Sequence, residues 1–328
     1  MKSSKKGAAQ AERLTALYRT MSLIRQVETA LIRLFANSEV PGFIHLSIGQ
    51  EAVAAGVASA LLPQDSLATT HRGHGHVLAR GMDVDGFMKE IMGREGGLCK
   101  GRGGSMHVAD LSLGILGANG IVGAGIPIAL GSAMAHQARK TGGVSVAFFG
   151  DGAMAEGVLH ETLNMASLWK CPLLLVCENN GWSEFSPTSR QFAAKLEQLA
   201  AAFGASYAKV NGNDVLAVAD AAMQGTAQLR KGNGPFVLEC MTTRVRGHFE
   251  GDSQKYRDAG ELGSVHEHDP LTATRAQLQA LGVDSTAIDQ AITAQVDRAV
   301  EAARADSLPT LERAIQDVYT QTMQEARE

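Results

Sequence analysis

One stretch, from Phe148 to Trp182, constrains the fold of this chain more than any other. An apolar run, VSVAFF, stops abruptly at Gly150-Asp151-Gly152, as a buried strand stops at the edge of a parallel sheet. Apolar residues then recur at helical spacing until Pro172 interrupts them. A second apolar run, LLLVC, leads into Glu178-Asn179-Asn180-Gly181. The pattern predicts a strand–helix–strand unit whose two strands end at the same edge of one sheet.

Ligands of open α/β sheets bind outside the carboxyl ends of the strands, where Asp151 and Asn180 are expected to lie. A carboxylate and an amide oxygen are hard ligands that suit Mg²⁺, which completes its octahedron with phosphate oxygens. The neighbouring glycines let a phosphate approach the backbone. We therefore predict a magnesium diphosphate ligand. The alternative is structural, with Asp151 capping the helix and Asn179-Asn180 forming a turn.

The alternation of strands and helices continues to Thr243 and predicts an α/β fold with a mostly parallel sheet flanked by helices. A long amphipathic helix is expected over residues 9–36 and further helices over 272–328, where Leu311, Ile315 and Val318 form one stripe. We predict an N-terminal helical extension at 1–40, the α/β domain at 41–270 and a C-terminal helical extension at 271–328.

Composition excludes several functional classes. The net charge of -4 argues against a nucleic-acid surface, and the sequence contains no apolar run long enough to span a bilayer. The four cysteines form no CxxC pair and no metal-ligand cluster, so we expect reduced core thiols. A cytoplasmic protein with no membrane partner is the expectation.

The segment LATTHRGHGH, residues 67–76, places three histidines beside Arg72. Arg72 is suited to clamp a phosphate through its planar guanidinium, and the histidines can donate to phosphate oxygens or to a substrate carbonyl. A zinc site is an alternative, because His74 and His76 on an extended loop would face the same side. A purely structural loop is the third possibility. We favour anion or substrate contacts, since the cluster holds neither cysteine nor acid.

Two further segments are predicted to approach the ligand. The glycine-rich residues 93–125 suggest a long loop across the mouth of the site, and GAGIPI lacks the third glycine of a dinucleotide fingerprint, which argues against NAD. Residues 244–268 lose apolar periodicity and carry Arg246, His248 and Tyr256. This charged segment is either a solvated connector or a catalytic lid.

These motifs together resemble the alpha subunits of thiamine diphosphate-dependent 2-oxo acid and acetoin dehydrogenase complexes, from about residue 14 to 320. The residues that carry the resemblance read FIHLSIGQEAV, HRGHGH, CKGRGGSMH, GANGIVGAG, GDGAMAEG, LWKCP, ENNG and RGHFEGD. The acetoin type is favoured because pyruvate enzymes tend to show tyrosine in place of His71 and serine in place of Phe249, and because of LGANGIVG. Phenylalanine cannot be phosphorylated, so kinase control at that serine position is excluded.

The resemblance implies a thiamine diphosphate-binding fold and assigns roles to individual residues. It makes Asp151, Asn180 and the backbone carbonyl of Trp182 ligands of Mg²⁺. It places His248 at the diphosphate and the reaction centre, and His45 at the entrance, as the two catalytic candidates. The remaining cofactor contacts that it implies are His71 and Arg72 at the diphosphate, Gly152 and Ala153 through their amides, and Gly120 and Val122 at the aminopyrimidine.

The resemblance also implies partners. The glutamate that tunes the aminopyrimidine belongs to a beta subunit in this family, whereas Glu51 matches a structural position of the alpha subunit. A beta chain, in an α2β2 assembly, is therefore expected to complete the site. Acetoin would be cleaved to acetaldehyde and a bound hydroxyethyl group, oxidised onto a lipoyl-bearing acyltransferase component or an artificial dye. The alternatives are oxidative decarboxylation of pyruvate or a branched-chain 2-oxo acid, a non-catalytic magnesium-nucleotide binding module, and a zinc hydrolase.

Overall fold

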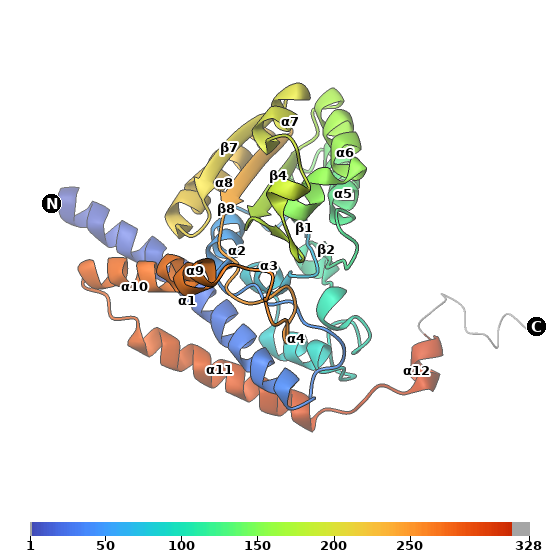
Figure 1. The fold of residues 1–328 in the computed structure, drawn as a ribbon, viewed down its shortest axis with the longest axis vertical. Coiled ribbons are helices and arrows are strands. Elements are labelled where there is room, and N and C mark those ends of the chain that lie inside the picture. Colours follow the sequence, from blue (N-terminus) through green and yellow to red (C-terminus); the bar gives the residue numbers. More distant parts are fainter. Residues whose placement is uncertain (1, 317–328) are drawn as a thin grey trace, which may run out of the picture.

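The protein is described by a computed structural model that covers residues 2–316, and its centre is a parallel sheet (Figure 1). The sheet has six strands in the order β2-β1-β3-β4-β8-β7, and every pairing in it is parallel. This confirms the predicted α/β class. The strands are β1 (Ser66–Ala68), β2 (Ile115–Gly117), β3 (Ser145–Gly150), β4 (Leu173–Asn179), β7 (Ser206–Asn211) and β8 (Phe236–Met241).

Both faces of the sheet are buried because successive side chains of each strand point to opposite sides. Along β3, Val146 and Phe148 join one apolar cluster, whereas Ala147 and Phe149 join the other. The second cluster is covered by α5 (Gly125–Arg139), α6 (Gly157–Leu168) and α7 (Leu196–Ala202). The first is covered by α1 (Lys2–Ala36), α2 (Glu51–Ala58), α3 (His74–Ala79), α4 (Val84–Ile91), α8 (Val215–Arg230), α10 (Pro270–Ala280) and α11 (Thr286–Ala305).

The helices at the two ends of the chain brace each other. Figure 1 shows α1 and α11 running side by side below the sheet. On α1, Tyr18 donates to Asp289 of α11 at 2.9 Å, and Arg25 bridges Glu51 of α2 and Asp269 at the start of α10. One apolar cluster contains residues of α1, the sheet and α11, while the domain boundaries after residues 40 and 270 stay predictions.

Several local predictions need correction. His74 and His76 lie in α3 instead of an extended loop, because the chain turns into a helix directly after Gly73. The segment 93–125 is not one continuous loop, since it includes the strand β2. A strand of three residues is too short to show a periodic pattern in the sequence. The short helix α12 (Leu311–Gln316) leaves Leu311 exposed, and Val318 of the predicted stripe lies outside the described residues.

A single buried carboxylate organises the glycine-rich segment that leads to the site. Glu90, on α4, is fully buried, and its Oε2 accepts the backbone N–H groups of Cys99 and Gly101 at 2.7 and 2.9 Å. Its Oε1 accepts those of Gly103 and Gly104 at 2.7 and 3.0 Å. Four backbone donors on one carboxylate hold the turn that precedes Met106, a residue of the cavity wall described below.

We expect Glu90→Gln to lower the free energy of unfolding by about 2–4 kcal/mol, because the amide directs donors at backbone N–H groups and leaves some of them unpaired. Urea denaturation would measure the loss. Glu301→Gln is the control, since the side chain of Glu301 is 70% exposed, and it should change stability by less than about 0.5 kcal/mol. Equal stability of the two variants would contradict this role for Glu90.

Candidate active site

A cavity of about 320 Å³ opens at the carboxyl ends of the central strands. The segment after β1, the ends of β3 and β4, the loop after β2 and the segment after β8 all contribute to its wall. The cavity brings together all eleven residues that the sequence nominated as site residues. They are His45, His71, Arg72, Gly120, Val122, Asp151, Gly152, Ala153, Asn180, Trp182 and His248.

Asp151 is a buried carboxylate at one end of this cavity. It opens a 3₁₀ turn directly after β3, and its Oδ1 accepts the backbone N–H of Asn180 at 3.4 Å. Its Oδ2 accepts the hydroxyl of Thr188. Burial raises the pKa of Asp151 to about 6, and within residues 2–316 no cationic side chain forms an ion pair with it. A buried carboxylate without a cationic partner fits a bound cation.

Oxygen atoms beside Asp151 complete a donor set for a metal ion. The Nδ2 of Asn180 donates to the side chain of Gln50 at 2.9 Å, and this contact sets which way the amide points. Its Oδ1 accepts the backbone N–H of Trp182 at 3.1 Å. The carboxylate of Asp151, the amide oxygen of Asn180 and the carbonyl of Trp182 are hard ligands of the type that Mg²⁺ takes.

Gly152 is required by the close approach of the loop after β4. A Cβ at this position would lie 2.4 Å from Oγ of Ser183 and 3.0 Å from its Cβ. A larger residue would require the Ser183 side chain to move, and Ser183 belongs to the strand β5 (Trp182–Ser183), which pairs with β6 (Ser186–Pro187). The glycine of the GDG motif therefore allows the Asp151 turn and the Trp182 loop to meet.

Three histidines form a second group in the cavity. The ring centroid of His45 lies 4.6 Å from that of His71 and 5.0 Å from that of His248, and the latter two are 5.4 Å apart. Burial, with the charge of Arg72, lowers the pKa of His45 to about 3, of His71 to about 2 and of His248 to about 4. All three imidazoles are therefore neutral at pH 7 and able to donate or accept hydrogen bonds.

Two buried guanidinium groups give this part of the cavity a positive charge. Arg72 donates to the carbonyls of Leu46 and His248 at 2.6 and 2.9 Å, and burial together with the charge of Arg244 lowers its pKa to about 10. Arg244 donates to the hydroxyl of Tyr256 at 2.8 Å. The Nε of Arg244 and the Nδ1 of His45 are buried and have no hydrogen-bond partner within residues 2–316. Charged groups and unpaired buried polar atoms of this kind suit an anion.

The other two histidines of HRGHGH have structural partners. His74 contacts Glu28 and Ser105 at 3.1 and 2.8 Å. His76 contacts Thr69 and Glu178 at 2.6 and 3.1 Å. The alternative of a zinc site built on this pair is therefore wrong, because the helix turns both rings into the core, where each ring nitrogen already has a partner.

Sequence reasoning assigned no role to Gln50, Thr188 or Arg244. Gln50 and Thr188 are distant in sequence from the groups they contact, so no spacing rule identifies them. For Arg244, the sequence did contain a signal that could have identified it as a site residue. It follows the end of β8 just as Asp151 follows the end of β3, and the rule that ligands bind at the carboxyl edge applies to both.

Comparison with known proteins places the chain in a family. Residues 19–314 match the family described as "Dehydrogenase E1 component". The chain is 43% identical over 312 residues to the Bacillus subtilis (strain 168) subunit alpha of acetoin:2,6-dichlorophenolindophenol oxidoreductase, with 94% of each chain covered. It is also 43% identical over 316 residues to the Cupriavidus necator protein of the same name, again with 94% of each covered.

A pyruvate dehydrogenase subunit is almost as similar. The E1 component subunit alpha of Zymomonas mobilis subsp. mobilis is 41% identical over 318 residues, which cover 95% of this chain and 89% of that protein. The chain thus belongs to the dehydrogenase E1 component family, a membership that implies thiamine diphosphate as cofactor. Among the described residues, no helix is long and apolar enough to cross a membrane.

The buried carboxylate should make the cofactor-free protein less stable than a neutral variant at neutral pH. The pKa of Asp151 rises from 3.8 to about 6 on folding, so its contribution to stability is fully present below pH 3.8 and is lost as pH rises through 6. We expect Asp151→Asn to be more stable than the parent by about 1–3 kcal/mol at pH 7.5.

Thermal or urea unfolding from pH 4.5 to 8 would test this, with the difference between variant and parent as the readout. The advantage of Asp151→Asn should shrink as pH falls below 6. A difference that does not change with pH would show that Asp151 does not titrate in this range.

Proposed function

We propose that this protein is the alpha subunit of an acetoin dehydrogenase that binds magnesium thiamine diphosphate and acts together with a beta subunit. The supporting observation is the polarity of the cavity. Asp151 and its neighbouring oxygens suit a hard cation, while Arg72, Arg244 and the neutral histidines of the same cavity suit an anion. A magnesium diphosphate has this distribution of charge.

Each side of the cofactor has matching residues in this chain. Asp151, Asn180 and the carbonyl of Trp182 would hold Mg²⁺. The diphosphate would be held by Arg72, His71, His248 and the amides of Gly152 and Ala153, and the aminopyrimidine would be contacted by backbone groups of Gly120 and Val122. When bound, the cofactor supplies a carbanion that attacks a carbonyl and serves as an electron sink.

The protein's own side chains exclude water and hold the reacting carbonyl. His45 and His248 are neutral and lie within a few ångströms of each other at the cavity wall, so either ring can donate a hydrogen bond to an oxygen of the substrate. His248 is carried by the charged segment 244–268, which therefore serves as the lid. Phe249 of this lid packs edge-on against Phe43, with ring centroids 5.5 Å apart.

A beta subunit would supply what this chain lacks. Glu51 is fully buried, bound to Arg25 and to the backbone N–H of Gly49, and absent from the cavity wall. Glu178, which does line the cavity, is occupied by His76. The loop residues Ile121 and Val122 border the cavity and are 72% and 49% exposed, as expected of a surface that a partner covers. We propose an α2β2 assembly in which the beta chain provides the glutamate for the aminopyrimidine.

In this assembly acetoin would be cleaved at the bond between its carbonyl and carbinol carbons, releasing acetaldehyde. The remaining two-carbon unit would lose two electrons to the disulfide of a lipoyl group on an acyltransferase, or to a dye. Acetoin is preferred to pyruvate because of His71 and Phe249, which replace the tyrosine and serine of the pyruvate type. Sequence identities of 43% and 41% do not by themselves separate the two substrates.

Substrate choice is testable with the chain co-expressed with its beta partner. We expect dye reduction to be at least about tenfold faster with acetoin than with pyruvate at equal concentration, a difference in transition-state stabilisation of about 1.4 kcal/mol. Faster turnover of pyruvate would overturn the choice of acetoin.

Calorimetry with Mg²⁺ and thiamine diphosphate tests the cofactor separately, and unchanged binding by Asp151→Ala would reject this metal site.

Two electron acceptors, the lipoyl group and a dye, distinguish between two possible roles of His248. If His248 serves transfer to the lipoyl group, His248→Ala should lower lipoyl reduction at least about tenfold more than dye reduction. Equal losses with both acceptors would assign His248 to positioning the diphosphate. His266→Ala is the control, because this histidine lies outside the cavity and should leave both rates near those of the parent.

A further inference from the structure

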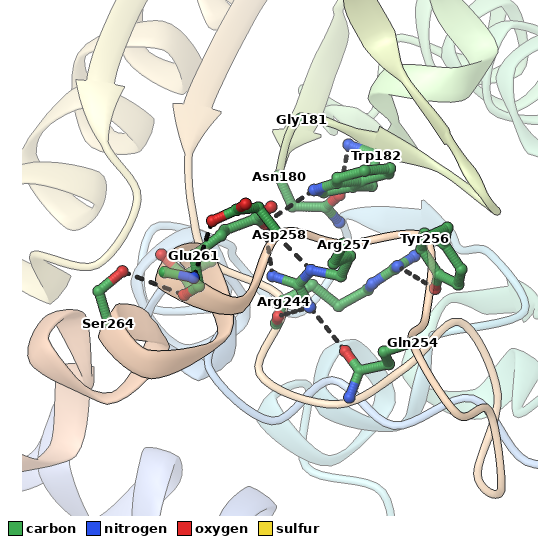
Figure 2. A network of polar contacts seen from close by, with 12 residues as sticks. Asn180, Gly181, Trp182, Arg244, Gln254, Tyr256, Arg257, Asp258, Glu261 and Ser264 are labelled. Atoms are coloured by element: carbon green, nitrogen blue, oxygen red, sulfur yellow. Dashed lines mark hydrogen bonds and ion pairs between the residues drawn. The ribbon is translucent and has the colours of Figure 1, made fainter.

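One carboxylate oxygen forms a polar link between the lid and the side chain of Trp182. Oε1 of Glu261, on α9 (Ala259–Ser264), accepts the indole N–H of Trp182 at 2.8 Å. The same oxygen accepts Nε and Nη2 of Arg257 at 3.0 and 2.7 Å. Figure 2 shows the indole of Trp182 and the guanidinium of Arg257 both directed at Glu261.

Arg257 extends this connection into the rest of the lid. Its Nη1 donates to the carbonyl of Arg244 at 2.9 Å and to Oε1 of Gln254 at 2.8 Å. The side chain of Arg257 is 2% exposed, so its charge needs an anionic partner. Among the described residues Glu261, whose side chain is 37% exposed, is the carboxylate that forms an ion pair with it.

The hydrogen bonds within the lid continue as far as the backbone of His248. Arg244 donates to the hydroxyl of Tyr256 at 2.8 Å, and that hydroxyl donates to Asp252 at 2.5 Å. Asp252 also accepts the backbone N–H of His248 at 2.8 Å. A continuous set of polar contacts therefore runs from the side chain of Trp182 to the segment that places His248 in the cavity.

The loop of Trp182 is short and has other contacts with the lid, because Arg244 donates to the carbonyl of Glu184 at 3.3 Å and the ring of Tyr256 packs edge-on against Trp182. The strand β5 has only two residues, Trp182–Ser183, and pairs with an equally short β6. It is flanked by Gly181 and Glu184, both in the left-handed region with φ of 80° and 50°. The hydrogen bond from the indole to Glu261 therefore acts on a strand of only two residues, one of which carries the proposed ligand carbonyl.

We propose that Glu261, with Trp182 and Arg257, couples the metal-binding loop to the lid, so that metal affinity and lid order rise and fall together. This inference rests on the proposed function, in which the carbonyl of Trp182 is a ligand of Mg²⁺. Glu261 and Arg257 act as positioning residues, since neither lines the cavity. Coupling of this kind is reciprocal, because whatever ties the lid to the loop also changes the affinity of the loop for its ligand.

The test uses the assembly with the beta subunit and the variants Trp182→Phe and Glu261→Gln. Trp182→Phe keeps an aromatic ring and removes the donor, while Glu261→Gln keeps the shape and removes the charge. The matched control is Glu250→Gln, because Glu250 pairs with Arg246 in the same lid without contacting Trp182 or Arg257. Two readouts are needed, namely Mg²⁺ affinity by calorimetry with saturating thiamine diphosphate, and hydrogen exchange of residues 244–264.

We expect each variant to bind Mg²⁺ roughly five- to tenfold more weakly, a loss within the net strength of a typical hydrogen bond. Each should also lose most of the protection that Mg²⁺ and thiamine diphosphate confer on residues 244–264. The double variant should bind Mg²⁺ about as tightly as the single variant with the lower affinity, because both changes break the same connection. Glu250→Gln should match the parent in both measurements.

Parental affinity and protection in both variants would overturn the coupling and leave the proposed function intact. Fully additive losses in the double variant would also overturn it, since they would indicate independent contacts. Absence of magnesium thiamine diphosphate binding by the parent assembly itself would reject the proposed function and this inference together.

Discussion

The parallel pairing of β3 with β4 is the constraint on which the rest of the site depends. Gly150 pairs with Glu178, so the two strands end at the same level of the sheet. Asp151 follows one residue beyond this level and Asn180 two residues beyond it, which brings their polar groups together. The apolar side chains of both strands bury both faces of the sheet, and a slip in register would move the site residues and expose core side chains together.

In this cavity, the groups that suit a charged ligand lower the stability of the ligand-free fold. Burial raises the pKa of Asp151 and lowers that of Arg72, so each group is costly to hold ionised without its ligand. The rest of the fold tolerates this cost because buried charges elsewhere are well paired. Glu90 receives four backbone donors, and Glu51 receives Arg25 and the N–H of Gly49. Among the described residues, the unpaired Nδ1 of His45 and Nε of Arg244 lie in the cavity, where a charged ligand can complete them.

Much of the candidate site could be predicted from local patterns. The end of an apolar strand followed by Gly-Asp-Gly predicted where Asp151 would lie, and the same logic placed Asn180. His74 and His76 show where that reasoning fails. Adjacent histidines in HRGHGH look equivalent, yet the helix that starts at His74 turns two of them into the core while His71 stays in the cavity. Side-chain direction depends on the local backbone conformation, which composition alone does not reveal.

The sequence by itself determined the class of fold and led to the prediction of a magnesium diphosphate ligand, because strand ends, helix periods and hard oxygen donors are local properties of the chain. Only the tertiary structure decided which distant residues meet. Gln50 contacts Asn180 across 130 positions, and the side chain of Trp182 reaches Glu261 across 79. Such contacts arise from the packing of α2 and the lid against the sheet edge. No spacing rule encodes them, since their partners are set by three-dimensional proximity.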